Sequence, residues 1–215
     1  RDDKKHILMS ATPFDAGGDR RSKLYKINLY NGRSKLLETS PVENATFATD
    51  QSGEVRFVVG ETKDLKRKVY YRANEDQEWQ LFRESNADEG GLQPLAFAAD
   101  NSIYVSDSTY TDLAGIYLYD LNDGTSTLIH QDEHSDPTNF WYTEASRRLY
   151  AVEYETTTPK YVFLTEGEET STLKNLLSAF PGQQVRLLSQ SRDESLSIVL
   201  AYSDRNPGDF YLFDA

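Results

Sequence analysis

The sequence contains no cysteine, and this absence excludes several kinds of site at once. Without thiols the chain has no structural disulfide, no thiolate zinc site and no cysteine nucleophile. Histidine is scarce too, since a Ser–His–Asp triad would have to use His6, His130 or His134. The Gly-x-Ser-x-Gly turn that holds the nucleophile of α/β-hydrolases does not occur. We therefore expect no catalytic residue, no cofactor site and no metal site in this chain.

Positive charge and long apolar runs are also lacking. Lys and Arg number 23 against 35 Asp and Glu, which gives a formal net charge of −12. Nucleic-acid binding needs clustered positive charge, and the densest basic run, residues 63–68, is interrupted by Asp64. No apolar run approaches the roughly 18 residues of a membrane span. We expect neither a nucleic-acid partner nor a membrane span.

What the sequence does contain is a repeat of about 46 residues. Short aromatic and aliphatic cores begin at Leu24, Val69, Ile116, Tyr161 and Phe210, with spacings of 45, 47, 45 and 49 residues. A second element, an apolar strand that runs into a polar turn, places an acid at the turn with a similar period. These acids are Asp50, Asp100, Glu144 and Asp193. Two elements with one period indicate a repeated structural unit.

Residues 92–136 show the unit most clearly, as four short β-rich segments separated by turn residues. Asn122-Asp123-Gly124 is a strong hairpin signal because Asn and Gly tolerate positive φ. Four antiparallel strands in this length are typical of one β-propeller blade. The fold class that we predict is all-β, a β-propeller segment of about four to five blades of four-stranded antiparallel sheets.

The predicted blade pieces are 1–41, 44–90, 92–136, 137–182 and 183–215. The first piece holds only the last three strands of a blade and the last piece only the first three, so we expect a partial β-propeller taken from a longer one. In the fourth piece a helix near 171–181 is expected to replace the last strand. Leu173, Leu176, Leu177 and Phe180 form its apolar face, with Ser171 as its cap.

Two clusters carry ligand-type side chains. The segment HQDEHSD offers His130, Asp132, Glu133, His134 and Asp136, which suit zinc or a harder ion, but we favour a solvated loop. The segment DLNDG at 120–124 resembles the start of a calcium loop and is predicted to be a turn.

Adjacent carboxylates occur at Asp132-Glu133 and Glu168-Glu169. Neighbours on a strand point to opposite faces, so neither pair is expected to share acid–base work. Both pairs are predicted to lie in polar turns.

The last third of the chain resembles the end of the propeller in the prolyl oligopeptidase family of serine peptidases, in the branch near acylaminoacyl peptidases. The resemblance is carried by Pro181-Gly182, Val185, Ser189, Ser191, Asp193, Ser203-Asp204, Pro207-Gly208 and Phe210–Asp214. It implies a two-domain enzyme in which the propeller restricts an α/β-hydrolase active site to short peptides. That catalytic domain is absent from this chain, so the resemblance implies a non-catalytic segment whose partner is the α/β-hydrolase domain of the same parent chain.

Some members of that family hold the substrate amine with a propeller Glu-Glu pair. Glu168-Glu169 is expected at a hairpin end instead of on a helix, so that role is not transferred. Two other functions stay open: a protein-binding scaffold of TolB-like or WD-like type, and a carbohydrate-binding propeller.

Overall fold

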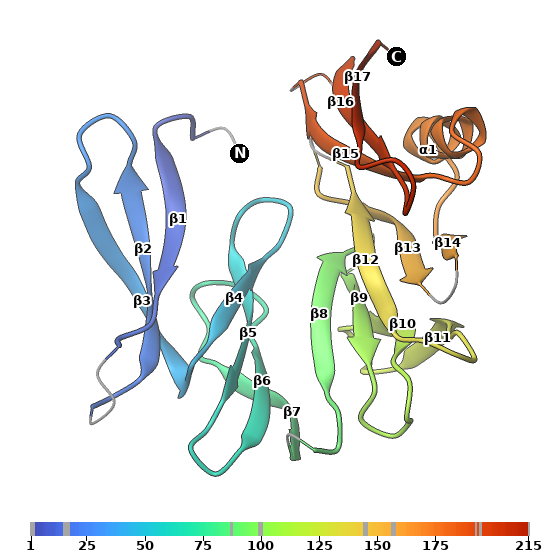
Figure 1. Ribbon diagram of the computed structural model, residues 1–215. Helices are drawn as coiled ribbons and strands as arrows, with labels where there is room; N and C mark the ends of the chain where they lie inside the picture. The colour runs from blue at the N-terminus through green and yellow to red at the C-terminus, as the bar shows by residue number, and fades with distance from the viewer. Residues whose placement is uncertain are drawn as a thin grey trace. The chain divides into compact units, whose positions relative to one another are not determined.

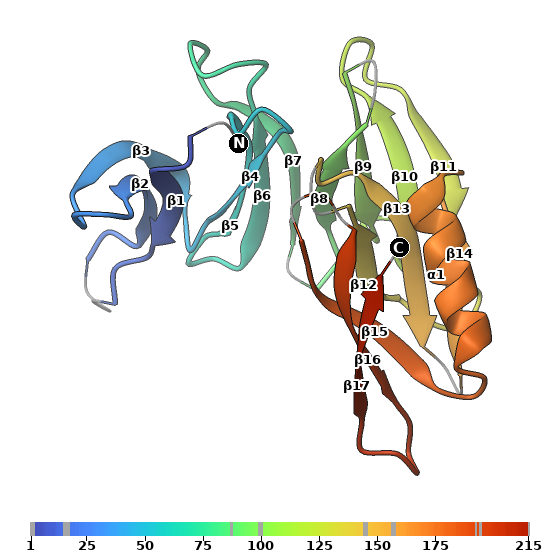
Figure 2. The ribbon, with the colours of Figure 1, turned by 90° about the horizontal axis from the view of Figure 1, so that it is seen from above.

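The computed structural model of the chain describes residues 3–14, 18–86, 88–98, 101–143, 146–155, 158–191, 193 and 195–214. The chain divides into two compact units, residues 1–128 and 129–215, which are described separately (Figures 1 and 2). The described residues form strands that pair in chain order into five antiparallel sheets, together with one helix. The all-β class and the single short helix are confirmed.

Three of the sheets begin in residues 1–128. Sheet one contains β1 (His6–Ala11), β2 (Arg21–Asn28) and β3 (Ser34–Glu43). Sheet two contains β4 (Thr46–Thr49), β5 (Val55–Glu61), β6 (Lys66–Tyr71) and β7 (Gln80–Asn86). Sheet three contains β8 (Leu92–Phe97), β9 (Ser102–Asp107), β10 (Gly115–Asp120) and β11 (Ser126–His130).

The other two sheets and the helix belong to residues 129–215. Sheet four contains β12 (Pro137–Tyr142), β13 (Leu149–Glu155) and β14 (Pro159–Phe163). The helix α1 (Glu168–Ala179) follows, and sheet five contains β15 (Gln184–Gln190), β16 (Leu196–Tyr202) and β17 (Asp209–Asp214). The five aromatic and aliphatic cores fall in β2, β6, β10, β14 and β17, one in each sheet.

The helix begins earlier than its sequence pattern predicts. Its first residue is Glu168 and its N-cap is Gly167, which makes no side-chain cap hydrogen bond, so the expectation of Ser171 as the cap is wrong. Ser171 lies inside the first turn and donates its hydroxyl to the carbonyl of Gly167 at 3.0 Å. Glu168 and Glu169 suit this position because the helix dipole stabilises negative charge in the first turn.

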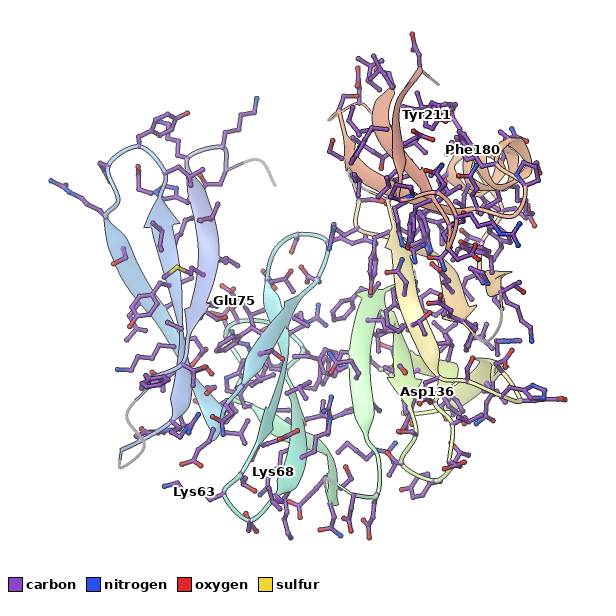
Figure 3. The ribbon with its side chains drawn as sticks, viewed as in Figure 1. Lys63, Lys68, Glu75, Asp136, Phe180 and Tyr211 are labelled. Carbon is purple, nitrogen blue, oxygen red and sulfur yellow. The ribbon has the colours of Figure 1, made fainter. Side chains whose placement is uncertain are left out.

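The predicted apolar face of α1 is confirmed. Leu173 and Leu176 are buried, and Leu177 packs beside them against sheets four and five. At the end of the helix the ring of Phe180 lies 4.9 Å from that of Tyr211 on β17 (Figure 3). The helix therefore covers apolar surface of sheets four and five.

Sheets two and three share the main apolar core of the first unit. Its buried members are Phe57, Val59, Val69, Leu92, Phe97, Ile103 and Val105. The ring of Phe57 is fully buried and lies 5.9 Å from that of Phe97, across the two sheets. Gly60 allows the chain at Glu43 to approach β5, because a Cβ at this position would meet the Glu43 carbonyl. Sheet one is thereby held against sheet two.

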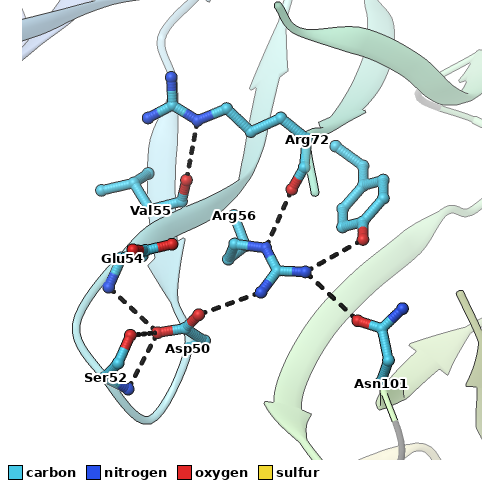
Figure 4. A network of polar contacts seen from close by, with 8 residues as sticks. Asp50, Ser52, Glu54, Val55, Arg56, Arg72 and Asn101 are labelled. Carbon is cyan, nitrogen blue, oxygen red and sulfur yellow. Dashed lines mark hydrogen bonds and ion pairs between the residues drawn. The ribbon is translucent and has the colours of Figure 1, made fainter. Parts of the chain in front are cut away.

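A polar network also joins sheets two and three at the turn after β4 (Figure 4). Asp50 accepts hydrogen bonds from the backbone N–H groups of Ser52 at 2.9 Å and Glu54 at 3.0 Å. Its other oxygen accepts from Arg56 at 3.1 Å. Arg56 donates further to the Tyr71 hydroxyl at 3.1 Å and to Asn101, in the β8–β9 turn, at 3.3 Å.

This network explains one of the repeated turn acids. Burial alone would raise the pKa of Asp50, but hydrogen bonds from Ser52, Arg56 and the turn backbone lower it below its ordinary value. Asp193 caps its own turn in the same way, accepting from the hydroxyls of Ser191 and Ser195. The other two repeated acids, Asp100 and Glu144, lie outside the described residues. At the two described positions the acid stabilises a turn.

Phe57→Ala is expected to lower the free energy of unfolding by about 3–5 kcal/mol, because it removes a ring from the buried contact between sheets two and three. Phe210→Ala is the matched control, since Phe210 is 69% exposed. Urea denaturation of both variants measures the difference. Equal losses would contradict the packing described here.

Asp50→Asn is expected to cost about 1–3 kcal/mol at neutral pH, through the lost charge-assisted hydrogen bonds. Because folding lowers the pKa of Asp50, its contribution is present above the unfolded value of about 3.9 and is lost as the pH falls through the lower folded value. Unfolding free energies measured between pH 7 and pH 2 should converge for wild type and variant. A constant difference down to pH 2 would refute the assignment.

Candidate functional site

Sheets four and five enclose a buried ion pair in residues 129–215. Glu153, in the middle of β13, has no exposed surface. Arg186 on β15 donates to both carboxylate oxygens, at 2.9 and 3.0 Å. The indole N–H of Trp141 donates to the same carboxylate at 3.2 Å. A buried charge needs such partners, and here the fork of the guanidinium matches the carboxylate.

Aromatic rings surround this pair. The guanidinium of Arg186 lies 5.8 Å from the ring centre of Trp141 and 5.9 Å from that of Tyr202. Burial, reinforced by the charge of Glu153, raises the pKa of Tyr161 to about 12. Both oxygens of Glu153 are occupied by donors, so the carboxylate is unsuited to act as a general base. The pair joins two sheets.

A pocket with a volume of about 250 Å³ lies at the start of α1. Glu168, Glu169 and Asp193 supply its acidic lining. The expectation that Glu168-Glu169 ends a hairpin is wrong, because both residues lie in the first turn of the helix. Glu169 pairs with Arg148. Both carboxylates line the pocket, and Arg148 neutralises the charge of Glu169.

The histidine-containing loop after β11 is held against sheet four by a hydrogen bond between Asp132 and Lys160. Asp132 is buried and accepts hydrogen bonds from the His134 backbone N–H at 2.9 Å and from Lys160 on β14 at 3.3 Å. The backbone hydrogen bond from His134 is the main cause that lowers the pKa of Asp132. The ring of His130 packs edge-on against Tyr154, 5.2 Å away. In the described part of the chain, no three His, Asp or Glu side chains gather as metal ligands would.

The DLNDG segment forms the β10–β11 turn, as predicted. Asp120 accepts from the backbone N–H of Asn122 at 2.8 Å, and Asp123 accepts from that of Thr125 at 2.8 Å. Gly124 has φ 76°, which glycine adopts without strain. The two carboxylates are thus used inside the turn.

The lysines of the basic run at residues 63–68, of which Lys63 and Lys68 are labelled in Figure 3, pair with acids of sheets one and two. Lys63 lies 3.6 Å from Glu43, and Lys66 and Lys68 lie 2.9 and 3.1 Å from Glu84. A cluster paired in this way offers little free charge to phosphates.

Across the described residues, no helix is long and apolar enough to span a membrane.

Sequence reasoning missed the pair of Glu153 and Arg186. Its signal was Glu153, the one carboxylate in the segment LYAVEY, where the other residues from Leu149 to Tyr154 are aromatic or aliphatic and buried. A charge in such a strand needs a partner. The partner lies 33 residues later, and only the packing of sheet five on sheet four identifies it.

No protein-family model matches the sequence, and no curated protein matches it. Solved structures do. A prolyl endopeptidase is similar over 99% of this chain and 32% of its own, with a TM-score of 0.64 and 12% identity. TolB from Acinetobacter baumannii is similar over 98% of this chain and 52% of its own, with a TM-score of 0.51 and 12% identity. The fold is that of a β-propeller segment.

These likenesses establish the fold alone, because the identities are low. The chain spans about a third of the prolyl endopeptidase and about half of TolB. The propeller predicted from the 46-residue repeat is thereby confirmed as a fold. These likenesses do not distinguish the acylaminoacyl-peptidase branch from other propellers.

Glu153→Gln is expected to cost about 1–3 kcal/mol of unfolding free energy, since it leaves the half-buried Arg186 charge without its partner. Glu166→Gln, at a side chain that is 88% exposed, is the control and should change stability by less than about 0.5 kcal/mol. Combining Glu153→Gln with Arg186→Met should recover part of the loss. A double variant that loses the sum of both single costs would contradict the pairing.

Proposed function

We propose that this chain is the non-catalytic propeller segment of a serine peptidase of the prolyl oligopeptidase type. The observation that carries the proposal is the likeness to a prolyl endopeptidase over 99% of this chain. The sequence resemblance in the last third of the chain points to the same family independently. In this proposal the catalytic serine, aspartate and histidine belong to an α/β-hydrolase domain outside these residues.

The blade assignment belongs to the same proposal. Pieces 44–90 and 92–136 each hold a four-stranded sheet, whereas 1–41, 137–182 and 183–215 each hold three strands in the described residues. In the fourth piece α1 occupies the place of a last strand. The acylaminoacyl-like hairpin is formed by β16 and β17, where the backbone N–H of Ser203 donates to the Asn206 carbonyl at 2.8 Å.

The segment's role is to control which substrates reach the active site. A propeller is a stiff scaffold, because its sheets pack face to face and, here, are linked by ion pairs such as that of the buried Glu153 with Arg186. A stiff scaffold over a hydrolase excludes folded proteins and bulk water while short peptides pass. The substrates are therefore short peptides, and peptide bonds are hydrolysed by the parent protein.

A serine-reactive fluorophosphonate is expected to label the parent protein and leave the 215-residue chain unlabelled, because the nucleophile lies outside the chain. The parent protein should likewise hydrolyse peptides, and the 215-residue chain should not. The reading frame beyond Ala215 should encode Gly-x-Ser-x-Gly and a later histidine. Labelling of the 215-residue chain, or a frame without that motif, would refute the proposal.

A second candidate function is a protein-binding propeller scaffold, supported by the likeness to TolB over 98% of this chain. In this case the reading frame would continue into further blades without a hydrolase motif. The parent protein would then show no peptidase activity and would bind a protein partner. The fluorophosphonate experiment separates the two functions.

A further inference from the structure

A larger cavity lies between β12 and β15, in residues 129–215. Its volume is about 520 Å³, within the range of small-molecule sites. It is lined by residues 138–142 of β12, 147, 150 and 186–190, and we call it the arginine cavity. Both strands can be followed in Figure 2.

Irregular strand pairing shapes this cavity. The register between β12 and β13 shifts at Thr138 and again between Trp141 and Tyr142. The register between β15 and β16 shifts at Leu188. A bulge turns a side chain away from regular alternation, and Thr138 and Leu188 both line the cavity. Leu188 keeps 52% of its surface exposed there.

The charge of the lining is opposite to that of the chain. Its residues include Arg147 and Arg186 and no carboxylate, although the chain has a formal net charge of −12. Arg186 is neutralised by Glu153. Arg147 is exposed, and its guanidinium lies 5.1 Å from the ring centre of Tyr142. Of the two cations that line the cavity, Arg147 is therefore the one that Glu153 does not neutralise.

The rest of the lining combines aromatic and leucine side chains with the polar residues Thr138, Asn139, Ser189 and Gln190. Phe140, Trp141, Tyr142 and Tyr150 line the cavity together with Leu188. Burial raises the pKa of Tyr142 to about 12, so its phenol stays neutral at physiological pH. A flat or apolar group can pack against exposed faces of these side chains, and a guanidinium binds a carboxylate through two parallel hydrogen bonds.

We propose that the arginine cavity binds a small carboxylate that carries an apolar or aromatic group, with Arg147 as the residue that holds the carboxylate. A free organic acid and the last residue of a peptide share this chemistry. The lining residues named above all belong to this chain. The proposed site stands whether or not the parent protein is a peptidase.

The test uses the 215-residue chain with Trp79→Phe, which leaves Trp141 as the only indole and a fluorescence reporter inside the cavity. N-acetyl-phenylalanine is titrated against its amide, and a tetrapeptide ending in phenylalanine against its C-terminal amide. Each acid should bind at least about 10-fold more tightly than its amide. Tighter binding of the tetrapeptide identifies a peptide C-terminus as the source, and equal binding identifies a free acid.

Arg147→Gln should weaken binding of the acids about 10-fold, and Arg147→Lys should weaken it less. Arg205→Gln is the matched control, because Arg205 is 92% exposed and lies outside the cavity. Circular dichroism and calorimetric titration of the wild-type chain check that the reporter substitution leaves fold and binding intact. Equal binding of acid and amide, no saturation up to about 10 mM, or equal effects at Arg147 and Arg205 would overturn the proposal.

Discussion

Burial of one carboxylate determines how sheets four and five meet. Glu153 has no exposed surface, and its charge is tolerable only where Arg186 and Trp141 donate to it. If β15 slipped by one residue in its sheet, Arg186 would turn to the opposite face and leave the charge unpaired. Apolar packing alone has no such direction. The pair therefore selects one arrangement of two surfaces that would otherwise tolerate several.

Residues 1–128 use arginine for the same purpose. Arg72 on sheet two reaches Glu38 on sheet one at 2.9 Å, and Arg83 reaches the Tyr119 hydroxyl on sheet three at 2.6 Å. The long side chain spans the distance between sheets, and its several donors fix the angle of approach. The apolar clusters supply most of the stabilisation, and these polar links supply the registration of neighbouring sheets.

The sequence predicts the parts of the fold that depend on local periodicity. Runs of aromatic and aliphatic residues, such as Phe210–Phe213, predict one strand in each sheet, but not how far it is buried, since Phe210 is 69% exposed. The boundary of α1 was missed because the Ser171 hydroxyl suggested a cap, whereas the helix dipole and the contact of Glu169 with Arg148 favour an earlier start. The link between Glu153 and Arg186 depends on packing between sheets, which local pattern does not encode.

The arginine cavity lies where bulges interrupt the regular pairing of the strands. A regular strand commits its side chains to the two sheet faces, so most residues of β13 are buried and unavailable to a ligand. The bulges at Thr138 and Leu188 release side chains from that alternation at the junction of two sheets. The side chains at the bulges can thus contact a ligand while the residues of β13 stay buried in the core. Because Glu153 already neutralises Arg186, the proposed recognition of a carboxylate depends on Arg147, which lies on the exposed turn between β12 and β13.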